Sequence, residues 1–166
     1  MRKEIILKKS FVIFSIKKFK EHKRSGIKMS NLSKPMGIAL IVCDEIIEDR
    51  HTGKKTLVGL FSRIHAKAFP AVHPKMNLFI SFDNAKGHYH SAIRIIREKT
   101  SEIIAEAKGE ITVKSPIDVT EMNIAFINLK FPETGVYNIE FYCEDELVLQ
   151  RRFVVADIPP QQKKRG

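Results

Sequence analysis

The sequence predicts an all-β protein, an antiparallel sandwich of two sheets over residues 36–158. Its 166 residues are the size of one domain with an extension, and short apolar runs of strand length follow one another without an internal repeat. In residues 76–82 and 135–143 apolar and polar side chains alternate, as expected for strands with one buried face. These two observations together favour packed sheets over helices.

The first half of this region predicts a hairpin followed by a half-buried strand. Residues 37–43 are a continuous aliphatic run, and residues 56–64 return after a turn that contains Gly53. Prolines 70 and 74 predict a bend, because proline lacks a donor for the strand ladder. The strand over residues 76–82 should then end in the turn at residues 83–87.

The second half is less regular. Residues 89–108 could form a helix or two strands, and their isoleucines and the break at residues 99–101 favour strands 89–98 and 102–107. The apolar parity changes between Phe126 and Ile127, which predicts a bulge in the strand over residues 122–131. Residues 135–143 and 147–156 are predicted to form the last pair of strands.

Charge divides the chain into three parts. Residues 1–35 hold 11 Lys and Arg but two acidic residues, and the tail at residues 159–166 holds three more basic residues. The predicted domain has 15 basic and 17 acidic side chains, so it carries none of the overall charge of +10. We therefore expect no specific nucleic-acid recognition, which needs basic residues gathered on the folded face.

The basic extension at residues 1–35 has three interpretations. Lysines interrupt the apolar stretch that a secretory signal would need, and no small-residue cleavage site follows it. An amphipathic helix on anionic lipid is the second interpretation, with apolar contacts from Ile5, Ile6, Phe11, Val12, Phe14 and Phe19. The third is that the segment is not natively translated, because its Lys, Ile and Phe are typical of AT-rich DNA. This third interpretation is favoured, with Met29 as the native start, whereas Met1 and Met36 are the other candidates.

Composition restricts the cellular setting. The longest apolar runs are far shorter than the roughly 20 residues that a helix needs to span a membrane, so no membrane span is expected. The two cysteines, Cys43 and Cys143, cannot form a dense disulfide framework. We therefore expect a cytoplasmic protein.

Residues 131–137 resemble the corner that opens the penultimate strand of immunoglobulin-like sandwiches. Glu133, Gly135 and Tyr137 follow one another at two-residue spacing, although the usual acid there is Asp. The resemblance implies structural roles for Gly135 and Tyr137, whose phenol would bond back to the loop backbone. An immunoglobulin-like topology is therefore the first expectation, and a different arrangement of two sheets is the second.

A second resemblance covers most of residues 37–159. Residues 43–47, residues 52–61 and the Gly135-Val136-Tyr137 turn are similar to a bacterial family of small sandwich-like domains of unknown function. The resemblance implies the fold and a bacterial, cytoplasmic source. It implies no ligand, cofactor or catalytic residue.

Few residues form a recognisable chemical site. His88 and His90 lie two apart on one strand face, a spacing compatible with a divalent metal, with Asp83 as a third candidate ligand. An acidic cluster offers oxygen ligands without the spacing of a calcium loop, and it consists of Asp44, Glu45, Glu48 and Asp49. Both cysteines lie in apolar strands, where a thiol packs more often than it ionises.

The sequence assigns no catalytic residue and no cofactor. The best functional hypothesis is a non-catalytic protein-binding module. It would contact a partner protein or a second copy through exposed apolar and aromatic surface at Tyr142, Val136 and Phe79, beside unpaired backbone at strand edges. The alternative is a metal-dependent enzyme that uses the His88 and His90 region.

Overall fold

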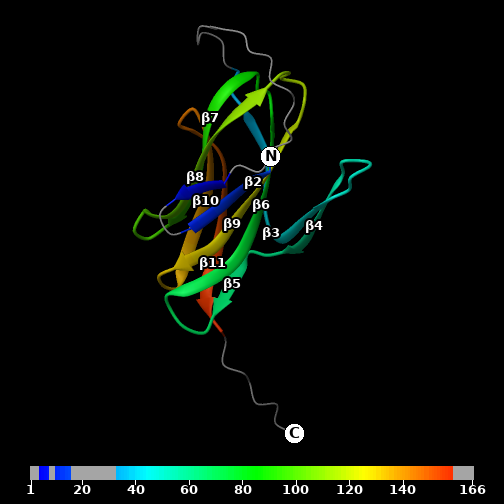
Figure 1. Ribbon diagram of the computed structural model, residues 1–166. Helices are drawn as coiled ribbons and strands as arrows, with labels where there is room; N and C mark the ends of the chain where they lie inside the picture. The colour runs from blue at the N-terminus through cyan, green and yellow to red at the C-terminus, as the bar shows by residue number, and fades with distance from the viewer. Residues whose placement is uncertain (1–3, 8–9, 16–32, 159–166) are drawn as a thin grey trace.

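The computed structural model describes residues 4–7, 10–15 and 33–158, and all regular structure in them is β-strand (Figure 1). The all-β prediction is confirmed. The first sheet has six strands, which in spatial order are β1 (Glu4–Leu7), β2 (Ser10–Ser15), β9 (Thr120–Phe131), β6 (Ala71–Asp83), β3 (Met36–Glu48) and β4 (Lys55–Leu60).

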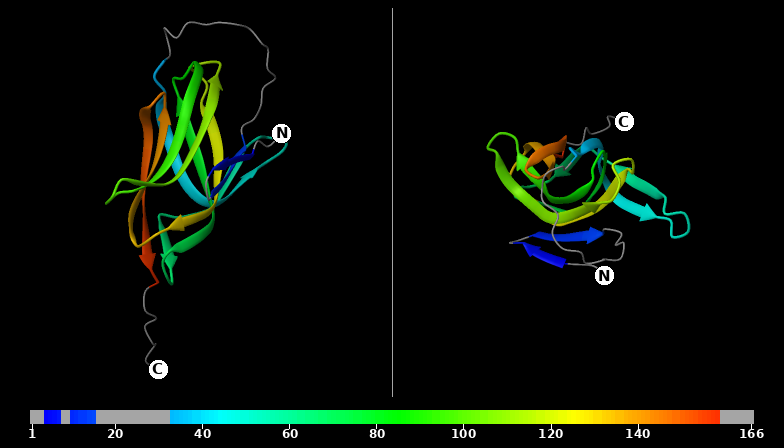
Figure 2. Two further views of the ribbon diagram at one scale, coloured as in Figure 1. Left: turned by 60° about the vertical axis from the view of Figure 1, so that its left-hand side comes forward. Right: turned by 90° about the horizontal axis from the view of Figure 1, so that it is seen from above.

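The second sheet packs against the first and curls around the shared interior (Figure 2). Its five strands, in spatial order, are β5 (Arg63–Ala66), β11 (Glu146–Asp157), β10 (Gly135–Cys143), β7 (Gly87–Arg97) and β8 (Glu102–Val113). The predicted two-sheet arrangement is therefore present. It departs from a fully antiparallel sandwich at one pair, because β5 runs parallel to β11.

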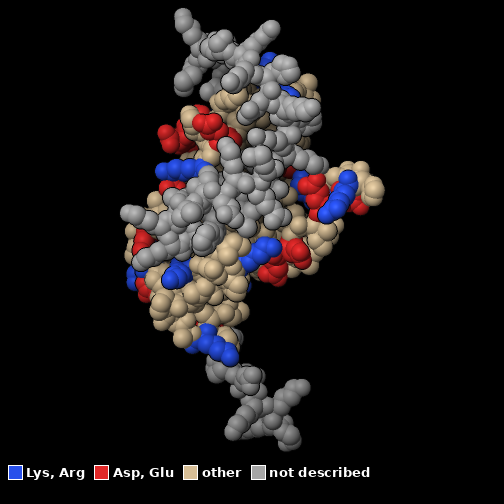
Figure 3. Space-filling model, viewed as in Figure 1, with Lys and Arg blue, Asp and Glu red and all other residues tan. Residues whose placement is uncertain are grey.

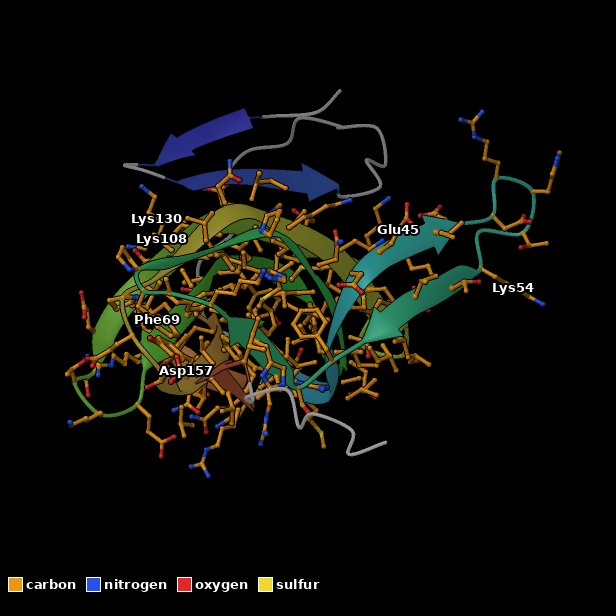
Figure 4. The ribbon with its side chains drawn as sticks, turned by 90° about the horizontal axis from the view of Figure 1, so that it is seen from below. Glu45, Lys54, Phe69, Lys108, Lys130 and Asp157 are labelled. Carbon is orange, nitrogen blue, oxygen red and sulfur yellow. The ribbon has the colours of Figure 1, made fainter. Side chains whose placement is uncertain are left out.

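The core lies between the sheets, where the side chains of both inner faces meet (Figure 4). An aromatic cluster at one end joins three strands. The Phe131 ring lies edge-on to Tyr137 at 5.1 Å between centroids and to Phe153 at 5.7 Å, and Tyr137 stacks on Phe153. Because Phe131 belongs to the first sheet and the other two rings to the second, the cluster fixes the sheets against each other.

Tyr137 lies near the start of β10, with its ring fully buried and its hydroxyl bonded to the preceding loop. The hydroxyl donates to the carbonyl oxygen of Glu133 over 2.8 Å, which is the bond expected of the corner. Glu133 also pairs with the guanidinium of Arg97, on the neighbouring strand β7. Gly135 has a φ of 148°, a conformation that residues with a side chain rarely adopt, so the turn into β10 requires glycine.

The predicted return strand at residues 56–64 is divided between the two sheets. It ends as β4 at Leu60 and resumes as β5 at Arg63, which pairs with β11. Gly59 has a φ of 68° and lies against the Asp44 carboxylate, which would clash with any Cβ at this position. The hairpin of β3 and β4 extends away from the body, as its labelled residues Glu45 and Lys54 show (Figure 4), and the chain turns back after β4 to reach the second sheet.

The predicted hairpin over residues 89–107 is confirmed as β7 and β8, which pair antiparallel with a register shift at Ile95 and Ile96. The predicted bulge in β9 is wrong. The pairing of β9 with β6 runs in one register from Thr120 to Phe131, and Asn128, at φ 54°, stands at the parity change. In β6 the buried positions also change from odd-numbered to even-numbered residues near Pro74, opposite the change in β9. Both strands therefore turn over together, and neither needs the extra residue that a bulge would insert.

The extension contains β1 and β2 where the second interpretation expected a lipid-bound helix. Ile5 and Ile6 lie in β1, whereas Phe11, Val12 and Phe14 lie in β2. The helix interpretation is therefore wrong for these residues. Phe19, Met29 and the basic tail lie outside the described residues.

We expect Tyr137→Phe to lower the free energy of unfolding by about 1 kcal/mol, because the change removes one hydrogen bond and leaves the Glu133 carbonyl without that donor. Urea unfolding followed by circular dichroism measures the effect. Tyr142→Phe is the matched control, since its hydroxyl bonds a carboxylate on the outer face, and we expect a smaller loss there. An unchanged midpoint for Tyr137→Phe would contradict the structural role of the corner.

Candidate functional site

The three residues considered for a metal site do not converge. His88 and His90 lie on the outer face of β7, and each faces its own partner on β8. The Nδ1 atom of His88 lies 2.9 Å from the Thr112 hydroxyl, and that of His90 lies 3.9 Å from the Glu110 carboxylate. Asp83 ends β6 in the other sheet. Within residues 33–158, no group of three or more His, Cys, Asp or Glu side chains is placed to hold a metal.

The acidic cluster is spread along the β3–β4 hairpin, and one of its members has a local structural role. The Oδ1 atom of Asp49 accepts hydrogen bonds from the backbone N–H groups of His51 and Thr52 over 2.9 and 2.7 Å, and also from the Thr52 hydroxyl. These bonds lower the pKa of Asp49, with the Thr52 backbone the largest cause. Asp49 thus stabilises the turn at the tip of the hairpin.

Both cysteines are buried and free. Burial raises the pKa of the Cys143 thiol to about 12, and the Glu144 carboxylate adds to the increase. Burial likewise raises the pKa of Cys43, whose thiol lies 3.8 Å from the Asn77 carbonyl oxygen. Both side chains therefore stay protonated near neutral pH, a state that is poorly nucleophilic.

We expect stability to fall between about pH 9 and pH 12. The Cys143 thiol ionises near 9 when the chain is unfolded but near 12 in the fold, so the unfolded state loses its proton first. The stability that comes from keeping the Cys143 thiol neutral is complete below pH 9. It is lost as the pH rises through the pKa of the thiol in the folded state. Urea unfolding at several pH values measures the slope. Cys143→Ala should be less stable throughout but lose less stability on going from pH 9 to 11, and an equal slope in both proteins would contradict the assignment.

The outer face of the second sheet contains an open hollow of about 350 Å³. We call it the outer hollow. Small residues of β7 and β8 are part of its lining: Ala92 pairs with Lys108, and Gly109 pairs with Ser91. Larger polar and aromatic side chains form most of the lining, namely His90, Arg94, Lys108, Glu110, Tyr142 and Asp145.

A row of hydrogen-bonded side chains crosses four strands beside the hollow. On β10, the Glu140 carboxylate accepts from the Tyr142 hydroxyl over 2.5 Å and from the Gln150 amide, on β11, over 3.2 Å. On β8, the Glu106 carboxylate accepts from Arg94 Nε over 2.8 Å and pairs with Lys108 over 3.1 Å. Burial opposes ionisation of Glu106, but the bonds from Arg94 and Lys108 outweigh it and lower its pKa.

Arg94 and Tyr142 join the two halves of this row. The guanidinium carbon of Arg94 lies 4.9 Å from the centre of the Tyr142 ring, close enough for a cation–π contact. The bond to Glu140, followed by burial, raises the pKa of the Tyr142 phenol. Each side chain also has its own carboxylate partner, so both are held in one position before any ligand arrives.

The structure changes the apolar and aromatic surface expected from the sequence. Tyr142, Val136 and Phe79 are half-buried rather than exposed. Tyr142 borders the outer hollow, whereas Phe79 lies on the other sheet with the Lys55 ammonium group 5.8 Å from its ring centre. Arg94, Glu106 and Lys108 were not singled out by sequence reasoning. The alternation of the sequence shows that these three side chains point outward from their strands. Their proximity to Tyr142, however, depends on the pairing of β7 with β8 and β10.

Residues 38–156 match DUF6941, described as a family of unknown function. The chain belongs to this family. The match begins in β3 and ends in β11, so it includes both halves of the sandwich and the outer hollow, and it leaves β1 and β2 outside. The resemblance to a family of unknown function is thus confirmed. The chain has no match among curated proteins.

Proposed function

We propose that residues 33–158 form a non-catalytic protein-binding module whose contact site is the outer hollow. The observation that carries the proposal is the fixed pair of Tyr142 and Arg94 in the lining of the hollow. Tyr and Arg are enriched among the residues that dominate protein interfaces, and side chains that are already fixed lose less entropy on binding.

The charges around the hollow favour a protein ligand. Glu110 and Asp145 lie on its rim together with Lys108 and Arg94, so a partner with side chains of both signs fits better than a polyanion. Lys and Arg are also interspersed with Asp and Glu on the face seen in Figure 3. This mixture supports the expectation that the domain does not recognise nucleic acid specifically.

We also infer an immunoglobulin-like topology and a bacterial, cytoplasmic setting. The Tyr137 hydroxyl bond to the Glu133 carbonyl supports the topology. Two buried cysteines that remain free support a reducing compartment. No helix in the described part of the chain is long and apolar enough to cross a bilayer.

The module should bind a partner protein or a second copy, and Tyr142→Ala should weaken that complex by at least about tenfold, because truncating a central interface residue costs about 2 kcal/mol or more. Sedimentation velocity at micromolar concentration tests binding to a second copy. Affinity capture from the host, followed by a titration with the purified partner, tests binding to a partner protein. Asn138→Ala is the matched control, on the same outward face of β10 but outside the hollow.

Two results would oppose this function. A complex that tolerates Tyr142→Ala and Arg94→Ala as well as it tolerates Asn138→Ala would remove the outer hollow as the site. A strictly monomeric protein that captures no partner, yet turns over a substrate or holds stoichiometric metal at His88 and His90, would favour the metal-dependent enzyme.

A further inference from the structure

Three of the four outermost strands of the described sheets, β4, β5 and β8, carry features that discourage pairing with another chain. β8 has four charged residues, Glu102, Glu106, Lys108 and Glu110, and a register shift against β7. β5 has only four residues. β4 has six residues and is bent at Gly59, which has a φ of 68°. Charges, bends and short length all protect the edge of a sheet.

β9 lacks these features over half of its length. It has 12 residues, and the six from Met122 to Ile127 contain no charge, glycine or proline. One edge of β9 pairs with β6 over the whole strand. Within residues 33–158 no strand pairs with its other edge, so the family-matched domain by itself leaves a long uncharged edge unpaired.

β2 occupies this edge. Its residues from Phe11 to Ser15 pair antiparallel with residues from Ile127 to Asn123, as Figure 1 shows beside β9. The sequence of β2, Ser-Phe-Val-Ile-Phe-Ser, is uncharged like the run that it faces. β2 also lies outside the matched region and enters from a separate segment, so the strand and the domain that binds it are distinct parts of the chain.

We propose that the edge of β9 is a strand-acceptor site that binds an extended, uncharged segment of a partner protein, and that β2 holds this site closed in the unbound chain. The partner segment runs antiparallel to residues 123–127 and is rich in aromatic and β-branched residues, as β2 is. Backbone hydrogen bonds supply the affinity in this mode of recognition, and alternate side chains supply the specificity.

Asn123 supports a polar contact at one end of the acceptor edge. Its Oδ1 atom is buried and has no hydrogen-bond partner. The residue lies opposite the backbone of Ser15 in the register with β2. A partner segment with a longer amide side chain at this position could donate to the oxygen, which adds to the preference for one register.

The test uses the full chain and a synthetic peptide of residues 8–17 as the probe. Val12→Pro removes one N–H of β2 and prevents regular pairing, so it should open the β9 edge. We expect this variant to bind the peptide at least tenfold more tightly than the wild type does, with slower hydrogen exchange at residues 123–127. Val12→Ala is the control, because it keeps the N–H group and should bind as the wild type does.

Cross-linking reports the register. In the Val12→Pro chain, Ala125→Cys should form a disulfide with a peptide that has cysteine at the position of Ile13, since these positions are partners in the structure. Glu121→Cys, four residues away on β9, should cross-link much less. Cys43 and Cys143 are buried, so they should not compete in the folded chain.

Equal peptide affinity for the wild type, Val12→Ala and Val12→Pro would overturn the acceptor site, as would cross-links without preference for Ala125. The proposal rests on the protein-binding function but uses a different surface from the outer hollow. Partner binding that depends on Tyr142, with no peptide bound at β9, would leave that function standing and overturn this site. Peptide binding at β9 with no role for Tyr142 would support the acceptor site and would remove the outer hollow as a contact site.

Discussion

The burial of Tyr137 between the sheets is the constraint on which the rest of the structure depends. Its ring contacts Phe131 of the first sheet and Phe153 of the second, and its hydroxyl is satisfied by the loop that joins β9 to β10. A buried phenol without a partner would carry a desolvation cost, so the loop must return to bring the Glu133 carbonyl within reach. Ring and loop together set where β10 begins and which of its faces points inward.

The outer hollow follows from that inward face. Because side chains alternate along a strand, burial of Tyr137, Ile139 and Phe141 forces the intervening residues Glu140 and Tyr142 to the outside. The register with β7 then places Arg94 opposite Glu140, one step along the sheet from Tyr142. The polar row is thus a consequence of core packing on the opposite face, and a slip of one residue would bury its charges.

The sequence predicts those parts of the structure that are determined by neighbouring residues, and it does not predict those that depend on contacts between distant residues. Alternation within β6 and β10 and the turn before β8 are local patterns, and the sequence predicted all three. The division of residues 56–64 depends on distant groups, because Arg151 of β11 donates to the carbonyl oxygens of Leu40 and Phe61 at the crossing between the sheets. The hollow was missed for the same reason, since the contact of Arg94 with Tyr142 exists only through strand pairing.

The two candidate surfaces differ in what keeps them available. At the outer hollow the charged side chains of β8 hold one another in place and also discourage strand pairing, so recognition there must use side chains. At β9 the uncharged run offers backbone groups, which would pair with many extended segments if they were left open. A strand carried on the same chain is effective at such an edge, because a tether keeps its local concentration high while leaving it exchangeable. The position of β2, hydrogen-bonded to the domain but outside its family boundaries, is consistent with a cover of this kind.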